Sequence, residues 1–121
     1  MTHDHCIIEW NDSAKQFHAT GYRMPYVDDS RGAQQMFFHM SVIDPGKMVH
    51  PPHDHAGEEI MFILEGTGEV QIGETKRIVH PMTALFFPEH VLHGLRNVGT
   101  SPIRYLVARV PPSAVLGVGA S

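Results

Sequence analysis

Cysteine is almost absent from this chain of 121 residues, which has a single one at position 6. One cysteine cannot form an intramolecular disulfide, and lone cysteines are usual in reducing compartments, so we expect a cytoplasmic protein. The first ten residues carry acidic and histidine side chains where a secretory signal has positive charge and then an apolar stretch. We therefore predict no targeting segment at this end.

Long apolar stretches and runs of basic residues are also missing. The longest wholly apolar run, Ile60–Leu64, is far shorter than the roughly 20 residues that a membrane-spanning helix needs. The formal net charge is -4 at pH 7, and lysine and arginine nowhere cluster, whereas non-specific nucleic-acid binding needs basic patches. We expect neither a membrane nor a nucleic acid as a partner.

Glycine, proline and histidine are plentiful, with 11, 9 and 10 residues respectively. Glycine and proline separate short runs rich in Val, Ile, Phe and Tyr, and no window longer than ten residues has convincing helical periodicity. Such recurring short strands are typical of an antiparallel sandwich or barrel. We expect strands at 36–43, 59–64, 69–72, 76–79, 84–87, 93–98 and 103–110, with one or two edge strands around 17–22.

The length suits one domain, so we predict a single domain over residues 1–121 with tails at 1–9 and 113–121. The first tail contains His3, His5 and Cys6, which together offer soft-metal ligands. We expect a frayed terminus there rather than a second metal site.

Two histidines and a glutamate have a spacing that suits a metal ion. Alternate side chains of a strand share a face, so His53 and His55 would point the same way, and Glu59 keeps the same parity. His93 lies on another predicted strand. Imidazoles and a carboxylate that converge on one face are typical ligands of a divalent metal ion. A closed structural zinc site is less expected, because such sites are usually rich in cysteine.

These residues resemble the two sequence motifs of the cupin family. The first motif is matched by Gly46, His53, His55, Glu59 and Gly66, and the second by Pro88, His93 and Asn97. The spacer after Gly46 is one residue longer than usual, and Met82 and His90 stand where the second motif has glycines. The resemblance covers roughly residues 36–112. It implies an all-β fold, an antiparallel jelly-roll β-barrel, with one metal ion held by His53, His55, Glu59 and His93.

The cofactor that the resemblance implies is one divalent transition metal ion per chain. Iron, manganese, nickel, copper, cobalt and zinc all accept such ligands, and an octahedral ion would keep two open positions. We therefore predict a metal-dependent enzyme for a small oxygen-bearing or anionic molecule, of dioxygenase, decarboxylase, isomerase or lyase type. The alternative is a non-catalytic ligand-binding or sensing module, which a pocket lined only by apolar side chains would favour.

Acid–base candidates are weak in this sequence and comprise His50, His39, Glu58 and Tyr105. We expect Glu58 and His90 to be exposed, whereas His39 has even chances of facing either surface of its strand. We expect His50 to be an ordinary loop residue, and the alternative is that it lines the mouth of the site or acts as a late ligand. Strand parity puts Tyr105 and Arg109 on one face, where an inward arginine would clamp a carboxylate, but an exposed arginine is expected. The predicted pocket residues are Met61, Ile63, Phe86 and Met40.

The resemblance also implies a homodimer. Strands from the N-terminal region would pack across a two-fold axis, which would protect the edges of the sheet. We expect exposed Phe37 and His39 to suit such an interface.

Overall fold

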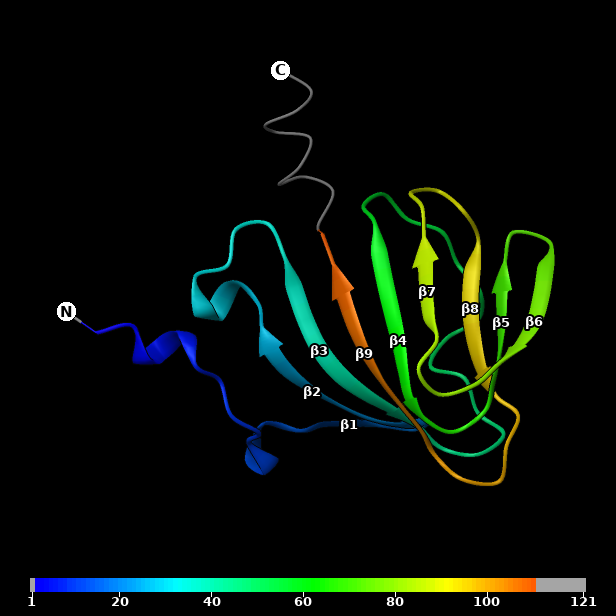
Figure 1. Ribbon diagram of the computed structural model, residues 1–121, viewed down its shortest axis with the longest axis horizontal. Helices are drawn as coiled ribbons and strands as arrows, with labels where there is room; N and C mark the ends of the chain where they lie inside the picture. Colours follow the sequence, from blue (N-terminus) through cyan, green and yellow to red (C-terminus); the bar gives the residue numbers. More distant parts are fainter. Residues whose placement is uncertain (1, 111–121) are drawn as a thin grey trace, which may run out of the picture.

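The computed structural model describes residues 2–110, and these form two antiparallel β-sheets (Figure 1). The strands are β1 (Gln16–His18), β2 (Gly21–Val27), β3 (Phe37–Ile43), β4 (Glu59–Glu65), β5 (Gly68–Ile72), β6 (Thr75–Val79), β7 (Ala84–Phe87), β8 (His93–Asn97) and β9 (Ile103–Arg109). Three short 3-10 helices, η1 (Asp4–Cys6), η2 (Asp12–Ala14) and η3 (Asp29–Arg31), are the only helices of the described part. The all-β prediction is confirmed.

The larger sheet has the strand order β1-β2-β3-β9-β4-β7, and the smaller has the order β6-β5-β8. Figure 1 shows the larger sheet curving from β1 to β7, with the smaller sheet beside it. Every strand from β3 to β9 begins and ends within one residue of its predicted range, since glycine, proline or polar turns flank each run. No helix within residues 2–110 is long and apolar enough to cross a membrane.

The core lies on the inner faces of the strands. Burial alternates along β4, where Glu59, Met61 and Ile63 are buried and Ile60 is exposed. This period of two is that of a strand with one face packed inward. The side chains of Ile63, Phe87 and Ile103 are fully buried in this core, and their removal from water is its main stabilisation.

The N-terminal segment differs in extent from its prediction. The expected edge strands around 17–22 are β1 and β2, and β2 runs on to Val27. Asp28 then starts η3, because its carboxylate accepts a hydrogen bond from the Ser30 amide at 2.9 Å. The predicted tail at 113–121 lies outside the described residues, and the predicted tail at 1–9 contains η1.

The two non-glycine residues at glycine positions of the second motif keep a glycine-like backbone. Met82 has φ +67° and His90 has φ +61°, and these are the positive-φ residues other than glycine within residues 2–110. The left-handed region is unfavourable for residues with a Cβ atom. The turn geometry is therefore retained although the glycines are not.

Candidate metal centre

The segment between β3 and β4, residues 44–58, carries two of the predicted ligands. It is a loop held against β8 by isolated bridges rather than the strand assumed from the sequence, so the alternation argument was wrong for this segment. His53 and His93 exchange both backbone hydrogen bonds, at 2.9 and 2.8 Å. That pairing places the two residues directly opposite each other and sets their imidazoles side by side.

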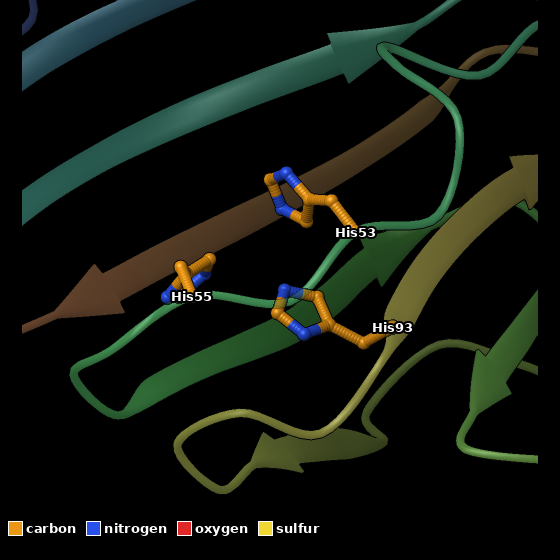
Figure 2. A group of neighbouring side chains, drawn as sticks. All are labelled: His53, His55 and His93. Atoms are coloured by element: carbon orange, nitrogen blue, oxygen red, sulfur yellow. The ribbon is translucent and has the colours of Figure 1, made fainter.

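Three imidazoles converge at this point. Figure 2 shows His53 and His55 from the loop and His93 from the start of β8 pointing toward one another. Their ring centres are 5.1 Å (53–55), 5.0 Å (53–93) and 4.9 Å (55–93) apart. One ligand nitrogen from each lies within 4.8 Å of the others. Three imidazole nitrogens that converge from two segments of the chain are a ligand set for one metal ion.

Hydrogen bonds set the tautomer of two of these rings. Nδ1 of His55 lies 2.9 Å from the Ala56 carbonyl, and Nδ1 of His93 lies 3.0 Å from the Val91 carbonyl. A carbonyl oxygen only accepts, so each Nδ1 carries a proton, and in the neutral ring this leaves the lone pair of Nε2 free for a metal ion. Both Nε2 atoms are buried and lack a hydrogen-bond partner. Orphaned buried acceptors of this kind fit a metal ion.

Burial and neighbouring rings keep the third imidazole uncharged. Burial, together with the positive charges that His50, His93, His55 and Arg109 can carry, lowers the pKa of His53 to about 4. Neutral imidazole is the form that ligates metals. The ring of Phe87 stacks on His93 at 4.2 Å between centres and fixes its plane.

The predicted carboxylate ligand lies next to this group. Glu59 opens β4 and is buried, with Oε1 at 3.3 Å from Nε2 of His55. The structure thus brings together all four residues that the motifs single out. The three histidines form the tight cluster, and Glu59 adjoins it through His55.

A cavity of about 270 Å³ opens beside the cluster. Its floor includes Met61, as predicted, together with Tyr105 and Val107. Burial raises the pKa of Tyr105 to about 12, and Glu59 adds to the shift while the Ser41 hydroxyl opposes it. The phenol therefore stays protonated at neutral pH and can serve as a hydrogen-bond donor.

Two of the predicted pocket residues lie elsewhere. Met40 pairs with Met24 across β2 and β3, and both are buried on the opposite face of the sheet. Phe86 is 51% exposed, and its neighbour Phe87 is the one that points inward. Both predictions were wrong because each face of these apolar strands carries large side chains. Ile63 shares the face of Met61 but is packed in the core beyond the cavity.

Polar side chains line the rest of the cavity. Arg109 faces it, which overturns the expectation of an exposed arginine, and His39 faces it as well, so His39 does not suit an outer interface. His50 also lines the cavity, with its ring centre 3.9 Å from that of His53. Arg23 is a further lining residue, and no motif or spacing in the sequence pointed to it. Glu58 and His90 are exposed, as expected.

The first residues contribute no comparable cluster. His3 and His5 lie with ring centres 5.9 Å apart near the exposed Cys6. Within residues 2–110, the only group of metal-capable side chains that converges is that of His53, His55 and His93.

Comparisons with known proteins agree with this arrangement. A family model described as "Cupin domain" matches residues 39–109. An uncharacterized protein of Methanocaldococcus jannaschii is 33% identical over 61 residues, which are 50% of this chain and 49% of that protein. The chain thus matches about half the length of this curated relative.

Solved structures share the fold at low sequence identity. A predicted oxalate decarboxylase from Thermotoga maritima has a TM-score of 0.75 at 17% identity, covering 86% of this chain and 97% of that one. The polyketide cyclase RemF from Streptomyces resistomycificus has a TM-score of 0.69 at 22% identity, covering 80% and 67%. At such identities the likeness shows the fold alone.

Proposed function

This chain belongs to the cupin family, and from that premise we propose that it is a metal-dependent enzyme acting on a small oxygen-bearing or anionic organic molecule. One observation carries the proposal. Three imidazoles, two of them with buried and unpartnered Nε2 atoms, converge at the wall of a cavity that also holds arginine, histidine and tyrosine side chains.

The residues that would hold the ion are His53, His55 and His93, with Glu59 as a fourth ligand. Their chemistry fits a divalent transition metal, because the imidazoles are uncharged donors and the carboxylate supplies one negative charge. When bound, such an ion polarises an oxygen of the substrate or activates dioxygen. The ligand set suits iron, manganese, nickel, copper, cobalt and zinc alike.

The side chains around the cavity would bind and orient the substrate. Met61 and Val107 make an apolar floor that excludes water. The protonated phenol of Tyr105 can donate a hydrogen bond, and the imidazole of His39 is neutral at pH 7, since burial and two arginines lower its pKa to about 4. A neutral imidazole offers one hydrogen-bond donor and one acceptor, so His39 can help to orient the substrate on this wall.

The polar lining favours an enzyme over a passive binding module. A pocket of only apolar side chains would offer no polar group to orient a reacting substrate, whereas this one contains His39, Tyr105 and two arginines. Proteins of the same fold include one described as a polyketide cyclase and one described as a predicted oxalate decarboxylase. These two descriptions support a lyase, isomerase or decarboxylase activity for this chain as much as a dioxygenase activity.

Elemental analysis of protein purified without added metal or chelator tests the proposal first. We expect about one equivalent of metal per chain, and turnover of at least one carboxylate, sugar or phenol in a substrate panel by the metal-loaded protein. Oxygen consumption would be followed if the metal is iron or copper. Absence of metal, together with no uptake on titration, would contradict the proposal. Metal without turnover on the panel would favour the binding module.

A further inference from the structure

Two arginines and a histidine lie on the wall of the cavity that β2, β3 and β9 form, with Arg109 opposite Glu59 on the neighbouring strand β4. Arg23 lies on β2, His39 on β3 and Arg109 on β9, and all three line the cavity. These strands are neighbours in the larger sheet, so the three side chains form one diagonal strip across it. Both arginine charges act on His39, which they help to keep neutral.

Each guanidinium is positioned by a neutral neighbour. Nε of Arg23 donates to Oε1 of Gln16 at 2.7 Å. The guanidinium carbon of Arg109 lies 5.7 Å from the centre of the Phe37 ring, which is a cation–π distance. These contacts leave the terminal N–H groups of both side chains available.

Neither arginine has an acidic partner. Among the ion pairs of residues 2–110, none within 4.0 Å involves Arg23 or Arg109. Glu59 is the cross-strand neighbour of Arg109, but its carboxylate contacts His55 instead. Asp28 and Asp29 line an adjoining hollow with both arginines, but neither forms an ion pair with them within 4.0 Å, and the Asp28 carboxylate accepts hydrogen bonds from Ser30. Two guanidinium groups without a carboxylate are suited to an anion from outside the chain.

We propose that Arg23, His39 and Arg109 form a subsite that binds a carboxylate of the substrate other than the group that would meet the metal. The inference rests on the proposed function for that other group, an oxygen of which would meet the ion. The substrate class is then a small bifunctional acid, such as an oxo or hydroxy acid with a second carboxylate. Glu59 offsets part of the positive charge of Arg109, and His39 carries no charge. The net charge of the strip therefore matches a carboxylate better than a phosphate dianion.

Pairs of 2-oxo acids with and without a far carboxylate test the subsite. The probes are 2-oxoglutarate against 2-oxopentanoate and 2-oxoadipate against 2-oxohexanoate, titrated calorimetrically into nickel-loaded protein. We expect the diacid of at least one pair to bind about tenfold tighter or more, as charge-assisted hydrogen bonds predict. Arg109→Gln should bring this ratio close to one without changing metal content or the affinity for the monoacid, and Arg23→Gln should reduce it.

The matched control is Arg104→Gln, since Arg104 lies on the same strand but outside the cavity, near Glu65 at 3.7 Å. It should leave the ratio unchanged. The subsite would be overturned if the diacid and the monoacid bound the unmodified protein equally well. It would also be overturned if the preference for the diacid remained in both Arg23→Gln and Arg109→Gln. Neither result would contradict the metal site.

A binding measurement on metal-free protein distinguishes failure of the subsite from failure of the proposed metal-dependent function. If no metal binds at all, the proposed function fails, and pentanoate against its amide still probes the subsite. A preference for pentanoate that Arg109→Gln removes would support the subsite, and no preference would overturn it. Tighter binding of inorganic phosphate than of pentanoate would overturn the assignment to a carboxylate.

Discussion

At the scale of single residues, the imidazole of His55 has two contacts that define its role. Its Nδ1 donates to the Ala56 carbonyl, and its Nε2 faces Glu59 and the other two rings. We expect His55→Ala to weaken metal binding by more than about 100-fold, because changes in groups that merely support a ligand already cost 10–100-fold. Metal content after dialysis measures the effect.

The control for that variant is His80→Ala, which removes an exposed histidine far from the cluster. It should keep full metal stoichiometry. Unmodified protein should also gain thermal stability from added metal, because a ligand that binds only the folded state stabilises it, whereas His55→Ala should not. Full stoichiometry in His55→Ala would refute the site.

Met82 offers a test of backbone conformation. It has φ +67° and is 74% exposed, so its side chain contributes little packing while its backbone is strained. We expect Met82→Gly to raise the free energy of unfolding by about 0.5–1 kcal/mol, since glycine adopts this region without the steric cost. Urea unfolding measures it. Met36→Gly, at an exposed methionine without positive φ, should give no gain, and an equal gain there would disprove the explanation.

A buried histidine should make stability depend on pH. Burial, with Arg23 and Arg109, lowers the pKa of His39 from 6.5 to about 4 in the folded chain. The unfolded chain therefore takes up the proton first, so the contribution of His39 is present above pH 6.5 and is lost as pH falls toward 4. We expect the decline in the urea midpoint between pH 7 and pH 5 to be smaller in His39→Gln than in unmodified protein.

The comparison for the pH series is His90→Gln, which alters an exposed histidine. Its decline should match that of unmodified protein. An undiminished decline in His39→Gln would show that other groups control the acid sensitivity.

At the scale of elements, β8 positions His93, and the side chain of Asn97 ties the end of this strand to the end of β3 and to the turn before β9. Nδ2 of Asn97 donates to the carbonyls of Ile43 and Ser101, and Oδ1 accepts from the Gly99 amide, all at 2.9 Å. The side chain is fully buried, so its removal would leave buried backbone groups unpaired. We expect Asn97→Ala to cost about 2–4 kcal/mol in the free energy of unfolding.

Denaturant unfolding of this variant is best compared with Asn11→Ala. Asn11 caps η2 by accepting from the Ser13 amide at 3.1 Å, but it is exposed. Loss of such a cap should cost about 1 kcal/mol at most, given the shortness of the helix. An equal loss of unfolding free energy in the two variants would mean that the buried hydrogen bonds of Asn97 contribute no more stability than an exposed cap.

Strands β3 to β9 were predictable from sequence to within one residue, but the face of each side chain was not. Turn residues such as Pro88 and Gly73 fix where a strand ends, whereas the direction of a side chain depends on what covers each face of the sheet. Phe86 and Phe87 are chemically equivalent in sequence, and only packing against His93 distinguishes them. The motif spacing singled out the histidines although the loop that carries His53 is not a strand.

The positions of Arg23 and Arg109 on the cavity wall could not be predicted from the sequence. Exposure is the usual state of arginine, so its direction could not be inferred from β9 alone. Arg23 lies in a segment with little alternation, where β2 was only partly anticipated. Their common location on one wall follows from the order β2-β3-β9, which brings together residues 86 positions apart in the chain.

At the scale of the whole molecule, the outer face of the larger sheet carries an apolar row. Register places Phe38 opposite Ala108, and Ile60 opposite both Ala108 and Phe86. Ile60 is 46% and Phe86 is 51% exposed, and the row lines a hollow of about 330 Å³. Exposed rows of this kind are sites of association.

We therefore expect a homodimer that packs through this outer face rather than through His39. Light scattering should give twice the chain mass of 13.5 kDa. Phe86→Glu should shift the protein toward the monomer, since a buried unpaired carboxylate at an interface is costly. Ile78→Glu, at a similarly exposed residue of β6 in the smaller sheet, should leave the mass unchanged. A monomeric mass for the unmodified protein, or a dimer that Phe86→Glu does not disturb, would refute the assignment of this face.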